Sequence, residues 1–77
     1  MTDKEARKIA EKRSGLKAKE CIPYKEGYIF NMDAGYDTKF TPLIFVHEKT
    51  GLSRVFHIQE DPHGVVEAAG KGLIYYG

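Results

Sequence analysis

The three histidines are the residues of this chain that could bind a metal ion. His47, His57 and His63 have no ligand-like spacing on one element, and no cysteine or carboxylate cluster accompanies them. His47 and His57 are expected several residues apart on one face of a β-hairpin, as half of a metal site or as two histidines at a solvent edge. The weak spacing favours the solvent edge, so we expect no metal and no other cofactor.

Cys21 is the one thiol that could act as a nucleophile. A reactive cysteine needs an adjacent base and an electropositive setting. Lys17 and Lys19 supply positive charge, and strand alternation places all three side chains on one side, which we expect to face solvent. A single thiol cannot form an internal disulfide, which is typical of a reducing, cytoplasmic setting.

Four acidic residues could be imagined as paired acids for proton transfer: Asp33, Asp37, Glu60 and Asp61. All four lie in expected loops near Gly or Pro, where turns and helix caps account for acidic side chains. The Gly70-Lys71-Gly72 run lacks the strand-then-helix context of a phosphate-binding loop. These patterns predict that the protein is not an enzyme.

Positive charge is concentrated near the N-terminus. Residues 1–20 carry seven basic and four acidic side chains, a net +3, whereas residues 21–77 carry five basic and seven acidic ones, a net −2. A basic helix permits contact with nucleic acid, but interleaved acidic residues also fit a solvated helix face. Nucleic-acid binding is therefore the alternative function, and its candidate residues are Arg7, Lys8, Lys12 and Arg13.

A helix is expected to begin after Thr2. Thr2 and Glu5 have the spacing of a capping box, good helix formers follow, and Gly15 suits a left-handed position at the C-terminal end. Its apolar stripe is narrow, with two alanines and one isoleucine. Such a helix covers a sheet but does not supply the core.

Strands are expected to follow this helix. Residues 16–24 alternate in polarity and predict an edge strand, because Pro23 cannot donate a ladder hydrogen bond. A turn at Glu26-Gly27 leads into a second strand over residues 28–32, and residues 33–41 have the composition of the longest loop.

Residues 42–58 predict a hairpin, because two runs rich in β-branched and aromatic residues flank Lys49-Thr50-Gly51. A three-residue loop places Val46 opposite Arg54. A four-residue loop shifts the pairing by one, so the register is left open. Under either register both faces of the hairpin carry large apolar side chains.

The C-terminal region predicts a short helix and an apolar tail. Asp61 is suited to the N-cap and Pro62 to the first helical position, with a stop at Gly70 or Gly72. The fold expected is a single α+β domain over residues 1–77. It has an N-terminal helix, a four-stranded antiparallel meander sheet, a short C-terminal helix and an apolar tail.

Both helices are expected on one face of this sheet, which leaves apolar side chains on the other. Burying each large apolar side chain contributes about 1.5–3 kcal/mol, whereas a small domain has a net stability of only roughly 5–15 kcal/mol. A second copy, a partner protein or the folded-back tail is therefore expected to cover them. The predicted interface residues are Leu43, Phe45, Val55, Leu73, Ile74, Tyr75 and Tyr76.

The order of a helix followed by a meander with a Thr-Gly turn resembles PepSY-like domains. The matching residues are Ala6, Ile9, Ala10, Tyr28, Phe30 and the run Val46-His47-Glu48-Lys49-Thr50-Gly51. The chain departs from the secreted members in its charged N-terminus, which has no signal-like character. We therefore do not expect this chain to share the peptidase-inhibitor role that the resemblance to secreted PepSY-like domains would imply.

The chain also resembles short proteins of phages and mobile elements of Gram-positive bacteria. The shared motifs are Cys21-Ile22-Pro23-Tyr24, Tyr28-Ile29-Phe30 and the Lys-Thr-Gly turn. This resemblance implies an accessory protein that acts by binding, such as one that blocks a host defence protein.

The function expected from the sequence is thus a non-catalytic, cytoplasmic protein-interaction module. It acts as a homodimer or docks on a host protein. No apolar run is long enough to cross a bilayer, so no membrane partner is expected.

Overall fold

The computed structural model describes residues 1–35 and 42–76. The elements are α1 (Asp3–Ser14), β1 (Lys17–Tyr24), β2 (Gly27–Asp33), β3 (Leu43–His47), β4 (Ser53–Phe56), a 3₁₀ turn η1 (Ile58–Glu60), α2 (Pro62–Gly72) and β5 (Ile74–Tyr75). Most of the loop expected over residues 33–41, with Asp37, lies outside the described residues. The α+β class is confirmed, but the sheet has five strands and not four, because the tail forms β5.

The sheet is antiparallel in the order β4-β3-β2-β1-β5. β1 therefore lies between β2 and β5, and the prediction of an edge strand is wrong. Pro23 is tolerated because β5 pairs only with Glu20 and Cys21, so the outer side of β1 is open where the proline stands.

The helix ends form as the sequence predicts. At the start of α1 the Glu5 amide donates to Thr2 Oγ1 at 3.3 Å, and the Thr2 amide donates to Glu5 Oε1 at 3.2 Å. Gly15 ends the helix with φ 73° and donates to the Glu11 carbonyl. Asp61 caps α2 by accepting from the Gly64 amide, with Pro62 as the first helical residue.

A bulge in β1 reverses the expected alternation. Ala18 pairs with Met32 and Glu20 pairs with Asn31, so Lys19 is the extra residue. Beyond it, Cys21 shares a face with Ala18 and is fully buried. The expectation that Cys21 faces solvent beside Lys19 is wrong for this reason.

The β3–β4 hairpin closes with four residues, 48–51. The His47 amide donates to the Leu52 carbonyl at 2.8 Å, and the Gly51 amide donates to the His47 carbonyl at 2.9 Å. Val46 therefore pairs with Ser53. The pairing predicted for a three-residue loop is shifted by one residue from the observed pairing, and the four-residue alternative is correct.

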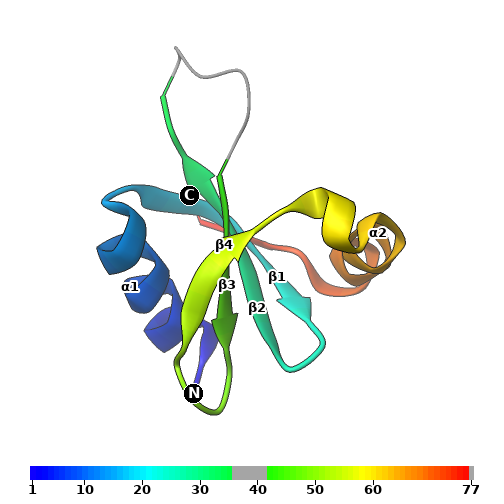
Figure 1. Cartoon of the computed structure of the whole chain (residues 1–77), viewed down its shortest axis with the longest axis horizontal. Helices are drawn as coiled ribbons and strands as arrows, with labels where there is room; N and C mark the ends of the chain where they lie inside the picture. Colours follow the sequence, from blue (N-terminus) through cyan, green and yellow to red (C-terminus); the bar gives the residue numbers. More distant parts are fainter. Residues whose placement is uncertain (36–41, 77) are drawn as a thin grey trace.

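One face of the sheet is covered by α1, which contacts β1, β2, β3 and β4. Figure 1 shows α1 on one side of the sheet and α2 on the other. The expectation that both helices share a face is wrong. Beneath α1 lies a core of small and large apolar residues: Ala6, Ala10, Ala18, Cys21, Phe30, Met32, Ile44 and Val46.

The second face is only partly covered. α2 packs mainly against β1, and its core contains Ile22, Tyr24, Ile29, Phe56 and Val65. Figure 1 shows α2 displaced from the β3–β4 hairpin toward the β1 side of the sheet. The uncovered part of this face lies over β3 and β4.

Candidate functional site

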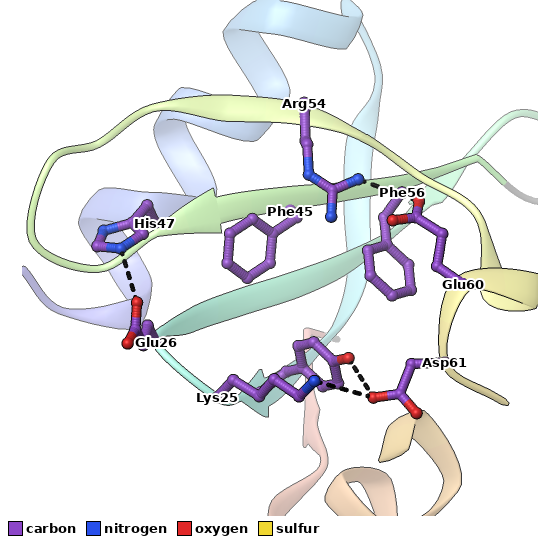
Figure 2. Close-up of a pocket in the computed structure, with 9 residues that line it drawn as sticks. Lys25, Glu26, Phe45, His47, Arg54, Phe56, Glu60 and Asp61 are labelled. Carbon is purple, nitrogen blue, oxygen red and sulfur yellow. Dashed lines mark hydrogen bonds and ion pairs between the residues drawn. The ribbon is translucent and has the colours of Figure 1, made fainter. Parts of the chain in front are cut away.

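The uncovered part of the second face forms a groove of about 780 Å³. We call it the β3–β4 groove and show it in Figure 2. Its side chains come from the end of β1, from the β1–β2 turn, from β3, from β4 and from the segment before α2. They are Tyr24, Lys25, Glu26, Phe45, His47, Arg54, Phe56, Glu60 and Asp61.

Three aromatic rings form the floor of the groove. The Tyr24 ring meets Phe45 and Phe56 edge-on, with centroid distances of 6.3 Å and 5.5 Å. Such edge-to-face pairs contribute beyond their buried area. Phe45 is only half-buried, so part of this apolar floor stays open to solvent.

Arg54 lies over this floor. Its guanidinium carbon is 5.6 Å from the Phe45 centroid and 5.3 Å from the Phe56 centroid, and Figure 2 shows it reaching between these rings. One guanidinium nitrogen donates to Glu60 Oε2 at 3.0 Å. The Arg54 guanidinium and the His57 amide hold the pKa of Glu60 below its usual range. The groove thus has a charged rim on an aromatic floor.

Asp61 closes the groove toward α2. The Tyr24 hydroxyl donates to Asp61 Oδ2 at 2.5 Å, and Lys25 Nζ lies 3.2 Å from the same oxygen. These contacts, with the capping bond from the Gly64 amide, lower the pKa of Asp61, and the Tyr24 hydrogen bond is the largest cause. Asp61 therefore ties α2 to the β1–β2 turn.

We expect Asp61→Asn to weaken the pH dependence of stability. Because folding lowers the pKa of Asp61, its contribution is fully present above the unfolded value of about 3.9 and is lost as pH falls through the folded value. Asparagine still caps α2 but carries no charge. Urea unfolding from about pH 7 to pH 2 should show the variant less stable at neutral pH, with the gap closing in acid. An equal gap at both ends of this range would contradict the assigned role.

His47 stands at the turn end of the groove. Its Nδ1 accepts from the Lys49 and Thr50 amides at 3.3 and 3.4 Å, so the neutral ring carries its proton on Nε2, which lies 3.3 Å from Glu26 Oε2. His57 follows Phe56 in extended backbone at the other end of β4 and points to the opposite face. His47 and His57 do not form half of a metal site.

Cys21 is enclosed beneath α1 beside Tyr76 and Asp3. Burial is the main cause that raises the pKa of the Cys21 thiol to about 11, while its hydrogen bond with Tyr76 acts in the opposite direction. The Tyr76 hydroxyl donates to Asp3 Oδ2 at 3.2 Å, and burial raises the pKa of this phenol. Nothing about this setting activates a thiol nucleophile.

We expect the native protein to react slowly with a thiol reagent such as dithionitrobenzoate. A pKa near 11 reduces the thiolate fraction about a hundredfold relative to the ordinary thiol, and burial blocks access as well. Denaturant should release one rapid equivalent. Fast labelling before unfolding would show that Cys21 is not buried as described.

The hairpin residues of the predicted interface are divided between two faces. Leu43 and Phe45 are half-buried on the α2 side, and both pack against the core beneath α2 that contains Phe56. Val55 pairs with Ile44 and lies on the α1 side, where it is 49% exposed. Its separation from Phe45 follows from the four-residue loop.

The tail residues of the predicted interface mostly have partners within the chain. Leu73 packs with the α2 core, whereas Ile74 and Tyr76 pack with the α1 core. Tyr75 is 75% exposed at the β5 edge. The tail therefore extends the sheet beyond β1 and does not fold over the second face.

The four nucleic-acid candidates also separate. Arg7 is half-buried, pairs with Glu11 at 3.2 Å and has its guanidinium carbon 4.1 Å from the Tyr76 centroid. Arg13 lies toward β4, where it donates to Ser53 Oγ at 3.5 Å. Only Lys8 and Lys12 lie together on the exposed side of α1.

The remaining acidic candidate, Asp33, accepts from the Gly35 amide at 3.0 Å and forms a turn. Within residues 1–35 and 42–76, no group of three or more His, Cys, Asp or Glu side chains is placed to hold a metal ion. In the same part of the chain, no helix combines the length and hydropathy needed to span a membrane.

The groove was missed from the sequence although a signal for it exists. In the four-residue register, Phe45 and His47 lie on the same face of β3. Phe45 is opposite Arg54 of β4, and His47 is opposite Leu52, which precedes β4. Choosing that register would have placed aromatic and cationic side chains on one face. The distant contribution of Asp61 has no comparable local signal.

Comparison of the chain with protein-family models, with characterised proteins and with solved structures finds no match. The resemblances to PepSY-like domains and to phage proteins therefore stay predictions. The features of the structure that bear on function are the β3–β4 groove and the outer edge of β4.

Proposed function

We propose that this protein is a non-catalytic interaction module that binds a partner protein through the β3–β4 side of its sheet. The observation that carries this proposal is the position of α2, which packs mainly against β1 and leaves the second face open over β3 and β4. On that open part Phe45 is half-buried and Leu52 is 73% exposed. A partner that covered them would remove apolar surface from water.

The chemistry of the groove fits a protein surface. The floor of the groove consists of tyrosine and phenylalanine rings, and an arginine lies at its centre. All three residue types are enriched in protein interfaces. Each cationic or histidine side chain of the groove has its own carboxylate: Lys25 with Asp61, Arg54 with Glu60 and His47 with Glu26. The groove therefore offers paired charges around apolar rings, which suit a mixed protein contact better than a free anion.

Site-specific photo-crosslinking in the producing cell tests the proposal. A photoreactive amino acid at Leu52 should give protein adducts, because this side chain lies at the rim of the open face. The matched control is Val66, an apolar residue of α2 that is 69% exposed and outside this surface. Adducts from position 66 alone, or from neither position, would remove the basis of the proposed function.

One observation favours the alternative of nucleic-acid binding. Lys4, Lys8 and Lys12 follow each other at four-residue spacing on the exposed side of α1, and among the described residues none has an ion-pair partner. Such a line of lysines can contact phosphates without reading bases. It differs from the predicted set because Arg7 and Arg13 lie on the flanks of the helix.

The alternative is tested by titrating DNA and RNA at two salt concentrations. Binding that weakens with salt, and that is lost when Lys4, Lys8 and Lys12 are all replaced by glutamine, would support it. Lys71→Gln is the control, because Lys71 pairs with Glu67 on α2. Absence of salt-dependent binding by the unaltered protein would exclude this function.

A further inference from the structure

β4 is an edge strand whose one sheet neighbour among the described residues is β3. In an antiparallel ladder, hydrogen-bonded and non-hydrogen-bonded pairs alternate. Since the His47 amide donates to the Leu52 carbonyl, Arg54 and Phe56 are the next positions that bond to β3. The backbone groups of Ser53 and Val55 therefore point away from the sheet.

Two of the outward backbone groups along the edge of β4 already have partners within the chain. The Val55 carbonyl accepts from the guanidinium of the adjacent Arg54 at 3.3 Å, a contact that an incoming amide can replace. The next outward position, His57, is already engaged, because its amide donates to Glu60 Oε2 at 2.9 Å. The free edge is thus short and centres on Val55.

Two exposed apolar residues lie at equal sequence distances from this centre, one beyond each end of β4. Leu52 lies three residues before Val55, and Ile58, which is 47% exposed, lies three residues after it. When two copies of β4 pair antiparallel and cross at Val55, the end of β4 next to Leu52 in one copy lies beside the end that leads to Ile58 in the other. A symmetric contact of this kind is self-complementary, as a twofold dimer requires.

We propose that two copies of this chain associate through β4, antiparallel, with Val55 at the twofold axis. This inference rests on the proposed function and names the partner as a second copy. The two Val55 residues exchange backbone hydrogen bonds across the axis, and the two five-stranded sheets become one continuous sheet. The β3–β4 groove of each copy then borders the groove of the other.

Charge favours the register with Val55 on the twofold axis over the register with Arg54 on the axis. With Val55 on the axis, Arg54 lies opposite Phe56 of the other copy, and arginine already packs on this type of ring within the chain. With Arg54 on the axis, two guanidinium groups face each other directly, and like charges in that position are destabilising. A contact this small is expected at the weak end of specific interfaces, with a dissociation constant on the order of 10 µM.

Sedimentation analysis tests whether the dimer forms. The weight-average mass of the unaltered protein should rise from one chain toward two between about 1 and 500 µM, as the stated affinity requires. Val55→Lys should stay monomeric throughout, because two ammonium groups then meet at the axis. Val66→Lys should associate like the unaltered protein, and melting curves of both variants establish that they are folded.

Single cysteines test the register. At a hydrogen-bonded antiparallel pair the Cα atoms are about 5.5 Å apart, within disulfide reach. Val55→Cys should therefore form a covalent dimer on mild oxidation. Ser53→Cys should not, because its two copies lie about 13 Å apart along the strands. The native Cys21 is buried and stays in every variant.

Three results would overturn the inference. They are a protein that stays monomeric at every concentration, association that Val55→Lys leaves unchanged, and faster cross-linking of Ser53→Cys than of Val55→Cys. A monomeric protein that still gives adducts with another protein from position 52 removes the dimer and leaves the proposed function standing. A monomer with no adducts removes both.

Discussion

Phe30→Ala is expected to lower the free energy of unfolding by about 3–5 kcal/mol, the range for deleting a buried phenylalanine ring. Phe30 lies in the middle of β2 with no solvent exposure, on the face that α1 covers. The centroid of its ring is 6.5 Å from that of Tyr76, and these two rings are nearly parallel. The distance to the centroid of the Tyr28 ring is 6.2 Å. The substitution opens a cavity between the helix and the sheet that small neighbours such as Ala6 cannot fill.

A loss of this size is a large part of the stability of a domain that starts from roughly 5–15 kcal/mol. Urea denaturation followed by circular dichroism measures it. Tyr75→Ala is the matched control, because this aromatic ring is exposed on β5, and it should change stability by no more than about 0.5 kcal/mol. A loss below about 1 kcal/mol for Phe30→Ala would mean that the α1 core is not packed as described.

Gly27→Ala is expected to destabilise the protein by about 3 kcal/mol or more, at or beyond the upper end of the range for overpacking. Gly27 begins β2 and pairs with His47 of β3. A Cβ atom at this position would lie 2.2 Å from the Val46 carbonyl oxygen and 2.8 Å from Phe45 Cζ. The Phe45 ring can turn aside, but the Val46 carbonyl belongs to the backbone of β3. Relief therefore requires separating β2 from β3.

Gly70→Ala is the control for Gly27→Ala. Gly70 lies in α2, and a Cβ atom there meets nothing within 4 Å. In a helix, alanine is more favourable than glycine by about 0.5–1 kcal/mol, so this variant should be slightly more stable. Thermal melts of both variants measure the contrast. Equal effects of the two alanines would contradict the close approach of β2 and β3.

The predictions that succeeded are those that depend on neighbours in sequence. A threonine followed three residues later by glutamate, a glycine after a helical run and an Asp-Pro pair each act through hydrogen bonds or dihedral angles of a few residues. The structure shows all three at the ends of α1 and α2. Local chemistry determines these ends, so the sequence pattern was sufficient.

The predictions that failed depend on how strands pair. Lys19 is an extra residue in β1, and nothing in its type distinguishes a bulge from regular alternation, so the side of Cys21 was reversed. Loops of three and four residues suit the sequence around Gly51 equally well. The choice of four separates Val55 from Phe45 and creates the groove.

The placement of α2 and the tail was beyond local patterns altogether. Each helix has an apolar side that fits a sheet, but the face it occupies depends on the path of the whole chain. The Tyr24 hydroxyl holds α2 on the second face through Asp61, a contact between residues 37 positions apart. β5 likewise pairs with β1 across the length of the chain. The coverage of the second face, on which the functional proposal depends, could therefore not be derived from the sequence.

Amide hydrogen exchange of β4 tests most directly the claim that its outer edge is a binding surface. The Arg54 and Phe56 amides bond to β3 and should be protected at every protein concentration. The Val55 amide should exchange rapidly near 1 µM and at least about tenfold more slowly near 500 µM, as the edges pair. Rapid exchange of Val55 at both concentrations, or equal protection at both, would contradict an edge that is open in the monomer and closed by association.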